Sequence, residues 1–105
     1  MSIEIADPRA YIDATMTEEQ WLQQVRDLAR LKGWLIYHTR DSRRSDPGFP
    51  DLVLVRLDRL IFAELKREKG RLTESQKAWL SALDETAETY VWRPSDWDTV
   101  IEVLT

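Results

Sequence analysis

The residues best suited to chemistry stand at the two ends of an apolar stretch that runs from residue 49 to residue 66. Pro50-Asp51 lies at its start, and Glu64-Leu65-Lys66 lies at its end. Charged side chains in apolar strands are costly unless they are paired or bind a ligand. Carboxylate oxygens hold a hard divalent cation, and a cation beside a lysine neutralises the charge on a phosphate. The stretch therefore predicts metal-assisted hydrolysis of a phosphodiester, with Glu64 and Lys66 on one strand face.

The same stretch predicts a β-hairpin whose register brings the two carboxylates together. Its polar interruption, residues 56–59, marks the turn, and pairing centred on that segment sets Arg56 opposite Arg59. Counting outward, Asp51 falls opposite Glu64, with Cβ atoms about 5 Å apart. A loop of two or four residues gives this register, whereas a three-residue loop would turn Asp51 away. Two carboxylates at that separation can hold one hard cation between them.

Length and composition indicate one small domain. Its 105 residues contain no cysteine, which excludes a disulfide framework, a thiolate zinc site and a thiol nucleophile. No apolar run approaches the roughly 20 residues of a membrane helix, and no signal segment opens the chain. We therefore expect a cytoplasmic protein without a membrane segment. Residues 17–105 are predicted to form the domain, and residues 1–16 are hard to interpret because Asp7-Pro8 argues against a helix through them.

The net charge of −4 is unusual for a protein that binds nucleic acid, but the charge is unevenly distributed. Between His38 and Lys77 the sequence has ten Lys or Arg against seven Asp or Glu, and elsewhere it has five against twelve. This distribution predicts a locally basic face on an acidic domain, which is compatible with phosphate binding.

The remaining elements alternate in type around the hairpin. Thr17 and Thr73 each begin a capping box that is completed three residues later, which predicts a helix after each. Residues 35–38 and 90–92 have the apolar character of strands, and Pro94 is expected to begin a last helix. The predicted fold is α/β with a mixed sheet, in the order helix, three-strand meander, helix, strand, helix.

This order, with Pro-Asp and Glu-x-Lys on the meander, resembles the restriction-endonuclease-like core of the PD-(D/E)xK nucleases. More narrowly, three segments resemble the VRR-Nuc family, in particular its compact stand-alone phage and bacterial members. They are GWLIYHTRDSRRSDPGFPDLVLV, FAELKREKGRLTESQKAWL and YVWRPSDW. The resemblance runs from about Thr17 to the C-terminus. It implies a Mg²⁺- or Mn²⁺-dependent deoxyribonuclease.

The resemblance also implies roles for particular residues. Asp51, Glu64 and the backbone carbonyl of Leu65 would bind the metal, and Lys66 would position the attacking water or stabilise the transition state. Glu18 on the first predicted helix would reach the metal or its waters, with Glu19 as second choice; the alternative for either is that it only favours the helix N-terminus.

Two further residues keep open alternatives. Gln76 matches the family's helix glutamine and would bind a phosphate or Lys66, unless it serves only the capping box. His38 would lie near the scissile phosphate or be a structural residue.

Two basic segments are candidates for phosphate contact. The first contains Arg40, Arg43 and Arg44, and the second contains Arg67, Lys69 and Arg71.

The expected substrate is branched DNA, such as a four-way junction, cut by a symmetric homodimer. One small domain offers one active site, and a two-fold dimer supplies the paired cuts that a junction needs. The expected contact surface is the apolar stripe of the last helix, unless it packs on its own sheet; its residues are Trp97, Val100, Ile101 and Leu104.

Two other functions are alternatives to this one. A non-catalytic DNA-binding or assembly module would be expected to have a damaged motif, whereas here the motif is intact. A base-specific restriction enzyme would need additional segments to enter a groove.

Overall fold

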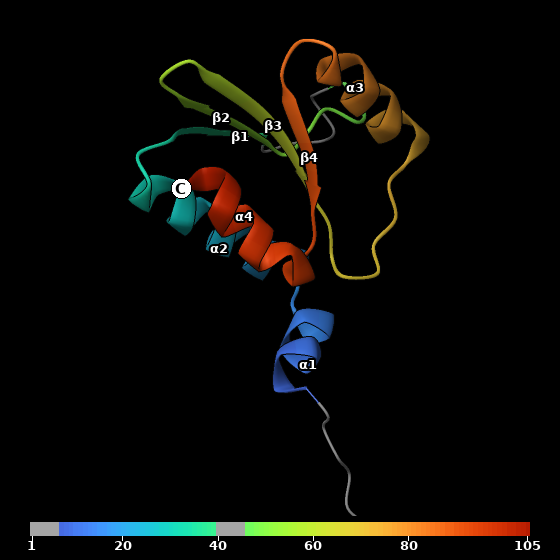
Figure 1. The fold of residues 1–105 in the computed structure, drawn as a ribbon. Helices are drawn as coiled ribbons and strands as arrows, with labels where there is room; N and C mark the ends of the chain where they lie inside the picture. Colours follow the sequence, from blue (N-terminus) through green and yellow to red (C-terminus); the bar gives the residue numbers. More distant parts are fainter. Residues whose placement is uncertain (1–6, 40–45) are drawn as a thin grey trace, which may run out of the picture.

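The predicted hairpin forms the centre of a four-stranded mixed sheet (Figure 1). The structure is a computed structural model, and it describes residues 7–39 and 46–105. The strands lie in the order β1 (Leu35–His38), β2 (Leu52–Arg56), β3 (Arg59–Leu65) and β4 (Glu88–Trp92). The first three strands pair antiparallel, whereas β4 runs parallel to β3. This arrangement confirms the predicted mixed sheet.

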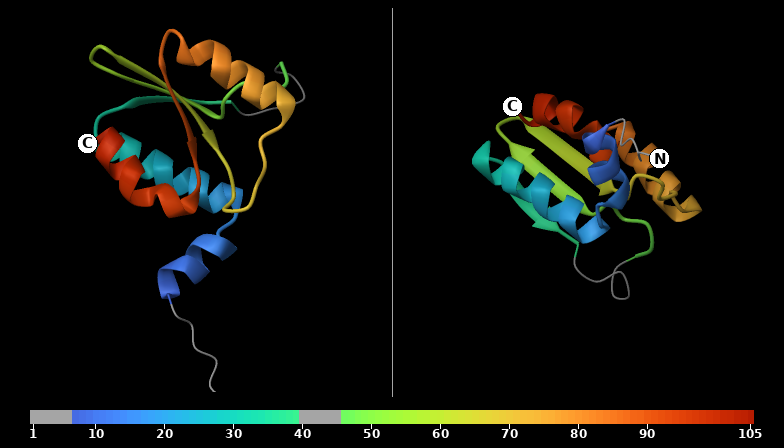
Figure 2. Two further views of the ribbon diagram at one scale, coloured as in Figure 1. Left: turned by 45° about the vertical axis from the view of Figure 1, so that its right-hand side comes forward. Right: turned by 90° about the horizontal axis from the view of Figure 1, so that it is seen from below.

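Helices cover both faces of the sheet, but unequally. The helices α2 (Glu18–Leu31) and α4 (Trp97–Leu104) lie side by side on one face, and α3 (Glu74–Asp84) lies on the other near β4 (Figures 1 and 2). A 3₁₀ turn, η1 (Pro94–Asp96), precedes α4. The core between the sheet and the α2–α4 layer is apolar and includes the fully buried side chains of Trp21, Leu54, Ile61 and Val100.

Both predicted capping boxes are present. In α2, the Thr17 hydroxyl accepts from the backbone of Gln20, whose side chain accepts from the backbone of Thr17. Thr73 and Gln76 make the same pair of hydrogen bonds at the start of α3. Each box satisfies backbone N–H groups that would otherwise lack a partner at a helix end.

The interpretation of Asp7-Pro8 as an argument against a helix in residues 1–16 was wrong. A helix, α1 (Pro8–Thr15), occupies this segment, with Asp7 as its N-cap and the Asp7 carboxylate accepting from the Arg9 N–H at 3.0 Å. Proline is disfavoured inside a helix, but its fixed φ and missing N–H suit the first helical position. Asp7-Pro8 is therefore a start signal here. The helix extends from the body of the domain (Figure 1), and none of its residues is buried.

The hairpin register agrees with the sequence prediction. Arg56 pairs with Arg59 across a two-residue turn, and Leu52 pairs with Ala63 at the other end of the ladder. The turn is unusual because Leu57 adopts a φ of 56° and is 93% exposed. Positive φ at this position normally favours glycine or asparagine. One step beyond the ladder, Asp51 and Glu64 are the next opposed positions.

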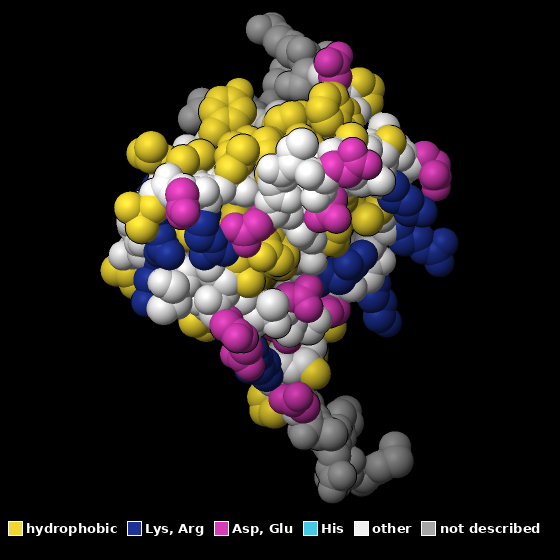
Figure 3. Space-filling view, turned by 45° about the horizontal axis from the view of Figure 1, so that its top comes forward, with side chains coloured by type: hydrophobic (Ala, Val, Ile, Leu, Met, Phe, Trp, Pro, Cys, Tyr) yellow, Lys and Arg dark blue, Asp and Glu magenta, His cyan; other side chains and the backbone are white. Residues whose placement is uncertain are grey.

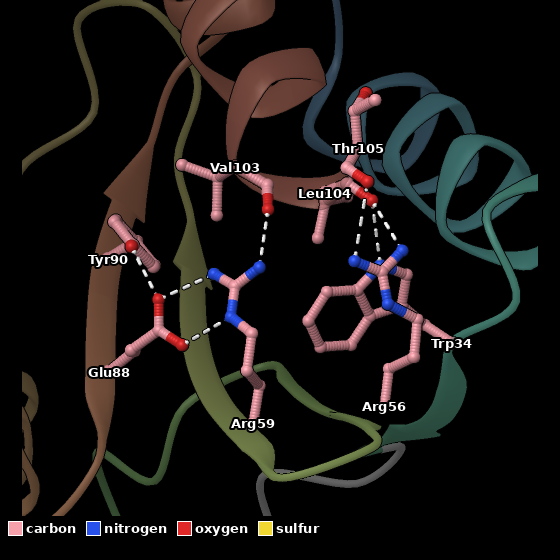
Figure 4. Close-up of polar contacts among 8 residues, drawn as sticks. All are labelled: Trp34, Arg56, Arg59, Glu88, Tyr90, Val103, Leu104 and Thr105. Carbon is pink, nitrogen blue, oxygen red and sulfur yellow. Dashed lines mark hydrogen bonds and ion pairs between the residues drawn. The ribbon is translucent and has the colours of Figure 1, made fainter.

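Arg56 and Arg59 bind the C-terminal end of α4 (Figure 4). Arg56 donates to the carbonyl of Leu104 at 3.0 Å, and Arg59 donates to that of Val103 at 3.0 Å. Both guanidinium groups lie over the ring of Trp34, whose Nε1 also donates to Leu104. Cations satisfy the free carbonyls at a helix C-terminus and oppose its partial negative charge. These two arginines therefore stabilise the fold at the hairpin turn, which reduces the number of cations free to form the predicted basic face.

The apolar stripe of the last helix packs inside its own chain. Val100 and Leu104 have no exposed surface, and the ring of Trp97 makes an edge contact with Trp21 at 5.8 Å. Of the two alternatives for this stripe, the structure therefore supports packing on its own sheet over a dimer contact, because its central side chains already fill the core.

The exposed apolar surface lies instead on the sheet face opposite α2 and α4. Leu35, Val55 and Leu60 form a cross-strand row there and are 74%, 38% and 40% exposed. Tyr37, in the next row, is 64% exposed. Figure 3 shows hydrophobic side chains gathered in the upper part of its view. Within residues 7–39 and 46–105, no helix is long and apolar enough to cross a membrane.

Candidate metal and nucleic-acid site

Asp51 and Glu64 lie at the end of the hairpin away from its turn. Asp51 immediately precedes β2, and its Oδ2 accepts from the Leu65 N–H at 2.8 Å. This hydrogen bond spans the two strands and places the Asp51 carboxylate beside Glu64 and Leu65. Glu64 is 2% exposed and is the only charged residue in the described part of the chain that is buried to this degree.

The surroundings of Glu64 disfavour its charged form. Burial, and then the neighbouring Asp51 carboxylate, raise the pKa of Glu64 to about 8, although Lys66 opposes this shift. Its Oε2 atom is buried and has no hydrogen-bond partner among the described residues. A buried oxygen without a hydrogen-bond partner costs free energy, and a bound cation can offset that cost. Glu64 therefore has the environment expected of a residue that binds a cation.

Gln76 connects the start of α3 to this carboxylate. Its Nε2 donates to Glu64 Oε1 at 3.0 Å, while its Oε1 accepts from the Thr73 N–H at 2.9 Å. The sequence left open a structural role and a role in the site, and Gln76 makes both kinds of contact. Its site contact is to Glu64, whereas a phosphate or Lys66 was expected. Lys66 Nζ lies 3.9 Å from Glu64 Oε1, which places its charge beside the carboxylate pair.

A cavity of about 190 Å³ opens next to Asp51. It is lined by Glu18, Glu19, Leu22, His38, Asp51 and Leu65. The first turn of α2 brings its two glutamates here because Trp21 and Val25, on the same helix, are fully buried against the sheet. The structure thus places Glu18 and His38 on the same cavity as Asp51 and leaves Glu18 and Glu19 as equal candidates. His38 is half-buried at the end of β1.

The second basic segment lies just beyond Lys66. Arg67, Lys69 and Arg71 are all exposed, and Arg67 and Lys69 line a hollow of about 290 Å³ with Ala14, Glu68 and Gly70. Arg93 donates to the Gly70 carbonyl at 2.8 Å, a contact that the sequence did not suggest and that fixes the turn. The first basic segment, with Arg40, Arg43 and Arg44, lies outside the described residues.

The donor set fits a hard cation. Among the described residues, no three Asp, Glu, His or Cys side chains converge as a metal cluster. The expected ligand set needs only two carboxylates and a backbone carbonyl, and Mg²⁺ usually binds through one or two carboxylates while it keeps several waters. The unpartnered Glu64 oxygen beside Asp51 is the feature that fits such an ion.

Comparison with known proteins places this fold in a class. A family sequence model described as the VRR-NUC domain matches residues 7–93. A solved structure described as a VRR_NUC domain superposes with a TM-score of 0.65 at 23% sequence identity; the match covers 81% of this chain and 94% of that chain. No curated protein matches the chain. The chain belongs to the VRR-NUC domain family, a family of nuclease domains, and the predicted fold class is confirmed.

Proposed function

We propose that this chain is a Mg²⁺- or Mn²⁺-dependent DNA endonuclease whose metal site is formed by Asp51, Glu64 and the carbonyl of Leu65. The observation that carries the proposal is the buried Glu64 carboxylate, with one unpartnered oxygen, beside the Asp51 carboxylate. A structural ion pair does not explain this arrangement, because Lys66 lies 3.9 Å from Glu64 and leaves Oε2 unpaired.

Each residue of the site has a task in hydrolysis. A divalent cation there would lower the pKa of a bound water and neutralise charge on the scissile phosphate. Lys66 supplies a point charge next to the carboxylates and orients the water or stabilises the anionic transition state. Gln76 holds the Glu64 carboxylate in one orientation through Oε1. Glu18 or Glu19 reaches the site from the cavity beside Asp51.

The exposed cations next to this site suit the DNA backbone. Arg67, Lys69 and Arg71 follow Lys66 directly, so a strand whose phosphate lies at the carboxylates would place its neighbouring phosphates against them. Arg40, Arg43 and Arg44 remain candidates for the same role by sequence alone.

The working species is proposed to be a homodimer that cuts branched DNA, for instance a four-way junction. The described residues form one carboxylate site, and paired cuts need two. The row formed by Leu35, Val55 and Leu60 is the better contact surface, because it is exposed, apolar and free of charge. A surface without charge is compatible with a second copy of itself.

The test is cleavage of linear, flapped and four-way DNA with Mg²⁺, with Mn²⁺ and with EDTA. Asp51→Asn and Glu64→Gln are expected to abolish cutting while they retain the fold and DNA binding. The loss should exceed the roughly ten- to hundredfold typical of substitutions around a metal's outer shell. Asp58→Asn, at the hairpin turn, is the matched control and should cut normally. Substantial metal-dependent cutting by purified Asp51→Asn would refute the site.

A further inference from the structure

Gly48 makes an unusually close contact with α3. Its φ is +90°, and a Cβ built on it would lie 2.7 Å from the Gln76 amide nitrogen and closer still to the Ser75 carbonyl group. Real Cβ atoms essentially never approach other atoms within 3.0 Å. The atoms in the way are backbone atoms of a capped helix turn, which cannot rotate aside as a side chain can. Only glycine fits both the backbone angle and the space.

The segment that contains Gly48 leads directly to Asp51. The ring of Phe49 makes T-shaped contacts with Trp79 and Phe62, at centroid distances of 5.1 Å and 5.9 Å, and Pro50 is fully buried. Asp51 then reaches the Leu65 N–H. These contacts make residues 48–51 a short, tightly packed segment. A shift of Gly48 would therefore be passed along it and would move Asp51 relative to β3.

The other side of the same contact leads to Glu64. The amide nitrogen that faces Gly48 belongs to Gln76, whose side chain donates to Glu64 Oε1. One turn of α3 thus contacts the segment that carries Asp51 and the side chain of Glu64 itself.

We infer that Gly48 is a positioning residue that sets the spacing of the Asp51–Glu64 pair for its cation. This inference rests on the proposed metal site. It assigns no chemistry to Gly48, which acts only by allowing the Pro50-Asp51 segment to lie against the first turn of α3.

The experiment compares Gly48→Ala with Gly33→Ala. Gly33 has a similar φ of +82° but no atom within 4 Å of a built Cβ, so its substitution introduces backbone strain without a collision. We expect Gly48→Ala to weaken Mn²⁺ binding to the DNA-free protein by about tenfold or more, measured by electron paramagnetic resonance. We also expect faster hydrogen exchange of the Leu65 amide by NMR. Gly33→Ala should change neither readout. Parental Mn²⁺ affinity and parental Leu65 exchange in Gly48→Ala would overturn the inference.

Two further arms keep the result interpretable. If Gly48→Ala does not fold, Phe49→Leu, which loosens the same segment without a collision, should show both effects in weaker form; parental values would overturn the inference. If the parent protein binds no Mn²⁺, the proposed function fails. The Leu65 exchange rate then still decides whether Gly48 positions Asp51.

Discussion

The Gln76 side chain joins the cap of α3 to the buried carboxylate of Glu64. Its Oε1 accepts from the Thr73 N–H at 2.9 Å, and its Nε2 donates to Glu64 Oε1 at 3.0 Å. A helix-capping residue thereby holds a candidate metal ligand, so substitutions at Gln76 can separate the two roles.

Gln76→Glu should retain the cap and lose the site contact. A glutamate can accept from the Thr73 N–H and favours a helix N-terminus, so thermal stability should be close to that of the parent. It cannot donate to Glu64 when ionised, and it adds a like charge beside that residue. Cleavage at neutral pH should therefore fall by about tenfold or more. Gln76→Ala should lose both roles and also lower stability by about 1 kcal/mol. Parental cleavage rates in Gln76→Glu would show that the Glu64 contact is dispensable.

The raised pKa of Glu64 predicts a pH-dependent stability of the metal-free protein. The folded state holds the Glu64 proton up to a pKa of about 8, whereas the unfolded chain releases it near the usual 4.5. The unfolded state therefore binds fewer protons between these values, and the contribution of Glu64 to stability is lost as pH rises from about 4.5 to about 8. In EDTA, the melting temperature of the parent should fall over this window more steeply than that of Glu64→Gln.

Metal should reverse this loss at the upper end of the window. Mg²⁺ or Mn²⁺ that binds the folded state alone raises its stability, and the effect should be larger at pH 8 than at pH 6 because the ion competes with the Glu64 proton. An equal metal effect at the two pH values would contradict the assignment of Glu64 as a ligand.

The sequence predicted the hairpin and its register because their signals are local. The polar interruption at residues 56–59 predicted the register that the structure has, and this register sets Asp51 opposite Glu64. The two capping boxes were equally local. In contrast, Asp7-Pro8 was misinterpreted because the same two residues suit a helix start as well as a break.

The remaining features depend on contacts between residues far apart in the chain. The predicted basic face included Arg56 and Arg59 among its cations. The carbonyl groups that they bind at the end of α4 lie more than 40 positions away in the sequence. Gly48 carries no local signal of its closeness to Ser75. The sequence therefore predicts which groups could react, whereas only the fold shows which charged groups are already engaged in structure.

Arg56→Met should lower stability without affecting the metal site. Arg56 donates to the carbonyls of Lys32 and Leu104, and hydrogen bonds from charged groups contribute about 1.5–3 kcal/mol. The melting temperature should fall by several degrees, measured by calorimetry, while Mn²⁺ affinity stays at the parental value. Arg30→Met, an exposed arginine in the last turn of α2, is the control and should melt with the parent. An unchanged melting temperature in Arg56→Met would mean that the α4 contact contributes little.

Arg67→Ala combined with Lys69→Ala should weaken DNA binding independently of sequence. Each phosphate contact releases counterions, so the slope of log affinity against log salt should become shallower by about 0.9 for each phosphate that is no longer neutralised. Arg30→Ala is the matched control for removal of an exposed arginine. A slope equal to that of the parent would show that the segment after Lys66 does not face the DNA.

The exposed sheet face makes the proposed dimer testable with substitutions that leave the core intact. Light scattering of the parent at micromolar concentration should give about twice the 12.4 kDa chain mass. Leu35→Glu with Leu60→Glu places four carboxylates in the proposed two-fold interface, where like charges repel and lose water. This variant should be monomeric and should cut one strand of a four-way junction at a time, while it retains Mn²⁺ binding.

Leu31→Glu provides the control for that experiment. Leu31 is 80% exposed but lies at the end of α2, outside the cross-strand row. Its substitution adds the same charge to an equally exposed leucine, so the dimer and the paired cuts should persist. If Leu31→Glu dissociates the protein and Leu35→Glu with Leu60→Glu does not, the interface lies at the α2 end. A monomeric parent that cuts linear duplex and junctions equally would exclude the dimer itself, because paired cutting would then have no second site to supply it.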